Sequence, residues 1–212
     1  GYDTPLFRNI ATPFKANPPF VPRDYNPVGS YRHQFEIPAQ WSDRQIILRF
    51  EGVASASFVW INGHEVGYNQ GAMEPAGYDI TPYVKVGKNQ IAVNVYQYSD
   101  GVYLEDQDMW RLAGIFRDVM LVARPKVSLF DYFVHTDFDE SYSDSQLNLQ
   151  LQLKNYSEKK SAAGLKLTAE LFDEERRKVF TRTLPVGTLS ASSSRTYSMQ
   201  QKVRTPQKWT AE

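Results

Sequence analysis

The chain has 212 residues, of which 42% are hydrophobic and 14% aromatic, and its formal net charge is zero. A neutral chain gives no global electrostatic reason to expect nucleic acid or an anionic membrane as a partner, and no apolar run approaches the roughly 20 residues that span a bilayer. The sequence contains no cysteine, which excludes disulfides, thiolate metal sites and thiol catalysis but leaves the compartment, cytoplasm or periplasm, open.

The first segment, residues 1–26, is rich in proline. Proline fixes φ and removes a backbone donor, so this segment is expected to be an extended, irregular arm. Its large apolar side chains, Phe14 and Phe20 among them, are too numerous for a free linker. We expect the arm to wrap a β-sandwich and to bury these rings against it.

From Tyr31 onward, short segments alternate apolar and polar residues, which is typical of half-buried strands. The predicted strands cover residues 31–37, 45–51, 56–61, 90–96 and 116–123. Asn62-Gly63 lies between two apolar runs and predicts a tight hairpin turn, because both residues tolerate positive φ. No segment keeps helical periodicity over three capped turns, so an all-β fold is expected.

The residue pattern changes near Pro125. After it, tryptophan becomes rare and segments in which polar and apolar residues alternate dominate. Further strands are predicted at residues 145–154, 164–171, 179–184 and 194–203, with a charged hairpin turn over residues 173–178. Their spacing favours a second, immunoglobulin-like sandwich. The predicted domains are therefore 1–125 and 126–212. The chain finishes on what reads as a loop, so we expect this second domain to be truncated at its carboxyl end.

One segment gathers three carboxylates, Glu105, Asp106 and Asp108, beside Trp110 and Arg111. A catalytic carboxyl pair for glycoside hydrolysis is one interpretation, but adjacent loop carboxylates rarely face each other across a sugar. A site for a hard cation such as Ca²⁺, Mg²⁺ or Na⁺ is a second. In a third, purely structural interpretation, Asp106 pairs with Arg111, Trp110 joins the core and Glu105 is solvated.

Several blocks of the sequence resemble the amino-terminal region of bacterial β-galactosidases of glycoside hydrolase family 2. The blocks are "FRN", "NPPFVPRDYNPVGSYRHQF", "FEGVASASFVWINGHEVGYNQG", "YSDGVYLEDQDMWRLAGIFRDV" and "KWTAE". The resemblance implies a jelly-roll (galactose-binding-like) sugar-binding domain, then an immunoglobulin-like domain, then a catalytic barrel with two glutamates in a retaining mechanism. Nothing in this chain matches that barrel, so no catalytic residue is expected here.

The resemblance also implies roles for individual residues. Asn9 matches a family asparagine that contacts galactose, and Asp108 matches an aspartate that holds galactose and ligates a monovalent cation, usually Na⁺. The cofactor expected for the parent enzyme is Na⁺ or Mg²⁺, and none is expected for the fragment alone. We call residues 105–111 the acidic loop. Its other residues, Glu105, Asp106, Trp110 and Arg111, are expected to position it.

The resulting expectation is a non-catalytic portion of an enzyme that hydrolyses terminal β-D-galactosides. Its expected partners are a carbohydrate, the barrel of the same chain and further copies in a homo-oligomer, with no nucleic acid or membrane. Three alternatives remain open. The chain is the same region of a β-glucuronidase or β-mannosidase relative, a purely structural or oligomer-forming unit, or an independent carbohydrate-binding module. The module would need an exposed aromatic row from Trp60, Tyr103 and Trp110.

Overall fold

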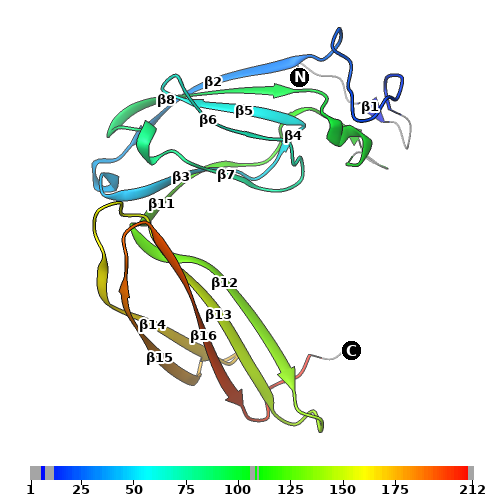
Figure 1. Cartoon of the computed structure of the whole chain (residues 1–212). Coiled ribbons are helices and arrows are strands. Elements are labelled where there is room, and N and C mark those ends of the chain that lie inside the picture. The colour runs from blue at the N-terminus through cyan, green and yellow to red at the C-terminus, as the bar shows by residue number, and fades with distance from the viewer. Residues whose placement is uncertain (1–5, 8–11, 106–107, 109, 210–212) are drawn as a thin grey trace. The chain divides into compact units, whose positions relative to one another are not determined.

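The computed structural model describes residues 6–7, 12–105, 108 and 110–209. Within these residues the regular structure consists of strands and three short 3-10 helices: η1 (Ala39–Trp41), η2 (Thr81–Tyr83) and η3 (Asp100–Tyr103). None of the described helices has the length and apolar character needed to cross a bilayer. The predicted all-β class is confirmed, and the chain divides into two compact units, Gly1–Ala123 and Arg124–Glu212 (Figure 1).

Unit 1 is a sandwich of two main antiparallel sheets, one above the other in Figure 1. The larger sheet has the order β2 (Val28–Ile37), β8 (Gly87–Tyr96), β5 (Ala56–Ile61), β6 (His64–Asn69). The smaller has the order β11 (Val119–Pro125), β3 (Arg44–Phe50), β7 (Ala76–Asp79). Two short pairs complete the unit: β1 (Leu6–Phe7) with β9 (Trp110–Arg111), and β4 (Val53–Ala54) with β10 (Gly114–Ile115).

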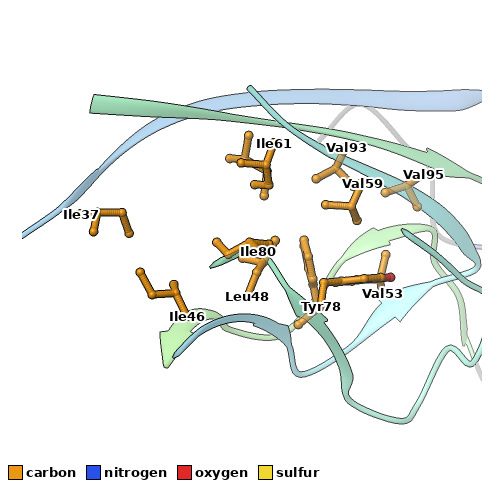
Figure 2. Packing of buried hydrophobic residues seen from close by; sticks show 12 residues of the cluster. Ile37, Ile46, Leu48, Val53, Val59, Ile61, Tyr78, Ile80, Val93 and Val95 are labelled. Atoms are coloured by element: carbon orange, nitrogen blue, oxygen red, sulfur yellow. The ribbon is translucent and has the colours of Figure 1, made fainter. Parts of the chain in front are cut away.

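The core of unit 1 lies between the two main sheets, as Figure 2 shows. Successive side chains of a strand point to opposite faces, so every second residue enters this core. Val59 and Ile61 of β5 meet Val93 and Val95 of β8 there, and the opposite sheet contributes Leu48. The residues between them, Phe58 and Trp60 for example, must therefore project from the outer face of the larger sheet.

The predicted turn at Asn62-Gly63 is confirmed. Asn62 has φ of 50° and Gly63 has φ of 86°, the left-handed values that a two-residue hairpin loop needs. The turn joins β5 to β6 with Ile61 opposite His64. The same register places Phe58 opposite Tyr68, and on its other side β5 places Phe58 opposite Asn94 of β8.

Unit 2 is also built from two antiparallel sheets, and the predicted second sandwich is confirmed. One sheet has the order β12 (Val127–Phe138), β13 (Ser145–Asn155), β16 (Ser193–Val203), and the other pairs β14 (Ala162–Phe172) with β15 (Lys178–Leu189). The charged turn predicted between the latter strands is present. The Asp173 carboxylate accepts hydrogen bonds from the Arg177 backbone at 2.8 Å and its guanidinium at 2.7 Å.

A fully buried amide organises one end of unit 2. Asn155, at the end of β13, has no exposed surface. Its side chain contacts the backbone carbonyl of Leu189, a residue of the hydrophobic core of unit 2. Its side-chain nitrogen lies 2.8, 3.2 and 3.0 Å from the carbonyl oxygens of Lys160, Leu189 and Ser190, and its oxygen accepts from the Ser157 backbone at 3.0 Å. One side chain thus satisfies the polar backbone of two loops.

Replacing this amide should destabilise unit 2. Asn155→Ala leaves buried carbonyl groups without donors, so we expect a loss of roughly 2–3 kcal/mol in the free energy of unfolding. Native-state hydrogen exchange of the β13 and β16 amides measures it. The matched control is Asn148→Ala on the same strand, whose side chain makes only a 3.4 Å contact with the Gln146 carbonyl. Equal protection in the two variants would contradict the assignment.

Candidate functional site

The segment that leads from β8 into the acidic loop of unit 1 is joined to the proline-rich arm by a pair of hydrogen bonds. The side-chain nitrogen of Asn26 donates to the Tyr98 carbonyl at 2.9 Å, and the Tyr98 backbone nitrogen donates to the Asn26 side-chain oxygen at 2.9 Å. These two bonds reproduce the exchange between paired strands, with a side chain replacing one of them. The chain just before η3 therefore has a fixed position relative to the arm.

A second anchor is the hydroxyl of Tyr103, the last residue of η3. It accepts a hydrogen bond from the Asn17 backbone at 3.1 Å and donates one to the Phe20 carbonyl at 2.6 Å. The ring of Phe14 packs edge-on against both Tyr98 and Tyr103, with centroid distances of 5.1 and 6.1 Å. The arm is thus held by polar groups that span more than eighty positions of sequence.

The arm was expected to bury the rings of Phe14 and Phe20, and the structure buries only the first of them in part. Phe14 is half-buried in the contact just described. Phe20 is 61% exposed, so the expectation that the arm buries it is wrong. The reason is local: Asn17 and Phe20 form an isolated bridge, with the Phe20 amide donating to the Asn17 carbonyl at 2.8 Å. This tight turn, together with the Tyr103 hydroxyl, fixes the backbone of Phe20 and leaves its ring at the surface.

The short ladder between β1 and β9 joins the arm to the far side of the acidic loop. Leu6 pairs with Arg111 and Phe7 pairs with Trp110 in antiparallel register. In the sequence, the predicted sugar ligand Asn9 stands two positions after Phe7, and Asp108 stands two positions before Trp110. Asn9 itself lies outside the described residues, as does Asp106.

Asp108 is exposed and has φ of 57°, a left-handed conformation that aspartate tolerates better than most residues. An exposed carboxylate offers oxygen to a sugar hydroxyl or to a cation. Among the described residues, however, no group of three or more histidines and acids is placed to hold a metal ion. Asp108 can therefore supply one carboxylate ligand of the predicted Na⁺ or Mg²⁺ site.

The purely structural interpretation of the loop is wrong for two residues. Trp110 is 60% exposed and does not join the core, because β9 alternates and directs the neighbouring Arg111 inward, where only 8% of its surface remains exposed. Glu105 is half-buried and accepts a hydrogen bond from the Ala72 backbone at 3.4 Å. Glu105 and Arg111 also line one small cavity. The proposed pair of Asp106 with Arg111 involves a residue outside the described part.

The three residues predicted for the aromatic row of an independent binding module lie on three different elements, η3, β5 and β9. Tyr103 packs on Phe14, Trp60 stacks on Phe58 with centroids 6.0 Å apart, and Trp110 is on β9. Sequence reasoning missed Asn26 and the ring cluster around Phe58. The alternation of β5 indicates the outward position of Phe58 and Trp60, but no local signal identifies Asn26, whose partner is 72 residues away.

Removing the Tyr103 hydroxyl tests the coupling of arm and loop. In Tyr103→Phe the ring contact with Phe14 persists while both hydrogen bonds are lost. We expect the free energy of unfolding to fall by about 1 kcal/mol and the Asn17 amide to exchange about fivefold faster, the factor that such an energy represents. Tyr132→Phe, at an exposed tyrosine of β12, is the control and should change neither. Unaltered exchange at Asn17 would show that the hydroxyl does not hold the arm.

Comparison with known proteins agrees with this architecture. The chain is 41% identical over 216 residues to a β-galactosidase of Priestia megaterium, with 100% of this chain and 21% of that protein covered. It is 43% identical over 179 residues to a β-galactosidase of Psychromonas ingrahamii, with 84% and 17% covered. A solved β-glucuronidase of Bacteroides uniformis matches with a TM-score of 0.80 and 26% identity, over 88% of this chain and 23% of that one.

The chain thus spans about a fifth of the length of the curated relatives that it matches. Residues 1–125 match the family described as "Glycosyl hydrolases family 2, sugar binding domain". That range includes the arm, the two sheets of unit 1 and the acidic loop. The chain therefore belongs to glycosyl hydrolases family 2, and its first unit is the sugar-binding domain of that family.

Proposed function

We propose that this chain is the amino-terminal, non-catalytic part of an enzyme that hydrolyses terminal β-D-galactosides, and that Asn9 and Asp108 bind the sugar for a catalytic barrel carried by the rest of the protein. The relatives that match all or most of this chain at about 40% identity are named β-galactosidases. The similarity extends over both units, since the Priestia protein aligns with the whole chain.

The observation that carries the proposal is the ladder between β1 and β9. Its antiparallel register joins the segment that leads to Asn9 with the segment that follows Asp108. This pairing supports the proposal that Asn9 and Asp108 act on the same sugar, for whose hydroxyls an amide and a carboxylate offer complementary donors and acceptors.

In this role Asp108 binds substrate and does not transfer protons. A retaining glycosidase needs one carboxyl group as nucleophile and one as acid/base, and we assign both to the barrel. Na⁺ or Mg²⁺ bound at Asp108 would supply a fixed positive charge for the sugar oxygens. The other cation ligands are then assigned to the barrel side. We assign the positioning of the loop to Glu105, which accepts a hydrogen bond from the Ala72 backbone at 3.4 Å, and to the buried Arg111.

Asn9 and Asp108 by themselves offer few contacts to a small, strongly hydrated ligand. Binding has to offset the lost translational and rotational freedom of the sugar, which costs several kcal/mol. We therefore expect galactose to bind at these two residues with a dissociation constant no tighter than the millimolar range when the barrel is missing. Assembly into a homo-oligomer stays a prediction.

A second candidate is the equivalent part of a β-glucuronidase, favoured by the structural match to the Bacteroides uniformis enzyme. The identity to that protein is 26%, against 41% to the Priestia β-galactosidase. The two substrates differ at carbon 4, where the hydroxyl is axial in a galactoside and equatorial in a glucuronide, and at carbon 6, where a glucuronide carries a carboxylate. The higher identity, over a larger share of this chain, is to the β-galactosidase. We therefore place the galactoside first.

The test compares chromogenic β-galactoside and β-glucuronide hydrolysis by the full-length protein, by this 212-residue chain and by two variants of the full-length protein. Asp108→Ala should lower kcat/KM for the galactoside roughly 10- to 100-fold, because it removes a hydrogen bond to a charged acceptor. Asp43→Ala, at another exposed aspartate of unit 1, is the matched control and should leave it unchanged.

Each outcome of this comparison has a distinct meaning. An inactive 212-residue chain with an active full-length protein agrees with the proposal. Hydrolysis by the chain alone would place catalytic groups within it and would contradict the proposal. Preference for the glucuronide would replace the galactosidase by the second candidate.

A further inference from the structure

The outer face of the larger sheet of unit 1 carries a cluster of four aromatic rings. Phe58 of β5 is at its centre, with ring centroids 6.0 Å from Trp60, 4.8 Å from Tyr68 and 6.0 Å from Tyr96. These residues come from three adjacent strands, β5, β6 and β8. Because Val59 and Ile61 point into the core, the cluster faces away from it, and Tyr68 remains 47% exposed.

Beside this cluster the surface forms an open hollow of about 650 Å³. Phe58, Tyr68 and Tyr96 line it from the sheet, and the arm contributes the exposed ring of Phe20 together with Arg23. The volume lies within the range of about 300–1,000 Å³ that small-molecule sites occupy. Asp108 is not among the residues that line this hollow.

A chain of hydrogen bonds forms the polar wall of the hollow. The Tyr68 hydroxyl donates to the side-chain oxygen of Gln70 at 2.5 Å, and the Gln70 nitrogen donates to the Asp100 carboxylate at 2.6 Å. All three residues line the same space. Burial, with a smaller contribution from the charge of Asp100, raises the pKa of Tyr68, so the phenol stays neutral and keeps its proton for the hydrogen bond.

We propose that this hollow is a second carbohydrate-binding site, which holds a neutral hexopyranose unit of an oligosaccharide. A pyranose ring has an apolar face of C–H groups and an edge of hydroxyls. The apolar face fits the rings of Phe58, Tyr68 and Tyr96, whose π-faces carry partial negative charge. The hydroxyl edge fits the amide and the carboxylate of the wall, which offer both donors and acceptors.

The mixture of groups disfavours other classes of ligand. A purely apolar molecule would leave the Gln70 and Asp100 groups desolvated without partners. A phosphate or a sugar acid would meet the Asp100 carboxylate, with Arg23 as the single cation in the lining. A galactopyranose is the hexose that fits best, because its axial hydroxyl at carbon 4 leaves a continuous patch of C–H groups on the opposite face.

The site is also organised before the ligand arrives. Gln70 is fixed from both ends by Tyr68 and Asp100, so its amide needs no reordering on binding. The backbone carbonyl of Phe20 is fixed by the Tyr103 hydroxyl. Fixed groups reduce the ordering cost that makes most sugar binding weak. The hollow is open, so a sugar unit inside a longer chain can occupy it as well as a terminal one.

The experiment is a titration of the 212-residue chain with lactose and with a linear β-1,4-galactan oligosaccharide, followed by ligand-observed NMR and calorimetry. We expect saturable binding with a dissociation constant in the millimolar range. Tyr68→Ala should weaken it about tenfold, since it removes one stacking ring and the donor to Gln70. Tyr132→Ala, at an exposed tyrosine of β12, is the matched control and should bind like the unaltered chain.

Two further variants make the result decisive. Tyr68→Phe keeps the ring and loses the hydroxyl, so it should fold normally and weaken binding by a smaller factor than Tyr68→Ala. Asp108→Ala should have no effect, which separates this site from the function proposed for Asp108. Binding that disappears in Asp108→Ala and persists in Tyr68→Ala would overturn the inference.

Failure of both sugars to saturate the chain at about 50 mM would also overturn the inference, because that concentration is well above the millimolar dissociation constant expected. The same holds if Tyr68→Ala abolishes self-association of the chain in sedimentation experiments while neither sugar binds. The ring cluster would then be an interface between copies of the protein.

Discussion

The arrangement of unit 1 around its candidate sites depends on a small set of hydrogen bonds between residues far apart in sequence. Asn26 completes a strand-like exchange with the backbone of Tyr98, and the Tyr103 hydroxyl bridges the backbone of the arm. Proline in the arm removes backbone donors, so most of the arm lies outside the short ladder of β1 with β9. Side chains have to satisfy its polar groups instead. The hollow beside Phe58 includes Phe20 and Tyr98 from this junction, and Tyr103 is the last residue of η3, just before the acidic loop that carries Asp108.

The same period-two rule explains why one sheet both builds the core and offers a binding surface. In β5 the residues alternate between aliphatic side chains that fill the sandwich and rings that face outward. Cross-strand register then brings Tyr68 opposite Phe58, so that rings from neighbouring strands meet on the outer face. Apolar rings left on a surface usually mark a contact site of some kind. The polar wall beside these rings favours a ligand with both apolar and hydroxyl faces.

Local signals in the sequence predicted what depends on near neighbours. The Asn62-Gly63 turn and the charged turn at Asp173 were predictable because a two- to six-residue segment determines its own backbone conformation. The alternation of β13 predicted its buried face in the same way. The Asn26 contact and the hollow were not predictable, because each depends on residues brought together over 70 positions or more, and the exposure of Phe20 combines a local turn with the distant Tyr103 hydroxyl. The roles of Asn9 and Asp108 came only from resemblance, since an amide or a carboxylate in a loop has no local signature.

The two proposed sites illustrate different ways in which a β-sandwich can recognise a weakly bound, hydrated ligand. Asp108 lies on an exposed loop in a left-handed conformation, and its oxygen atoms gain binding free energy only where a neighbouring surface removes water from the sugar. In the proposed second site, the rings beside Phe58 would exclude water from one face of the ligand, and Gln70 and Asp100 would offer hydrogen bonds to the other. A site of the first kind makes binding conditional on assembly with another domain. A site of the second kind binds weakly but independently, which would raise the local concentration of a polymeric substrate without requiring the groups that cleave it.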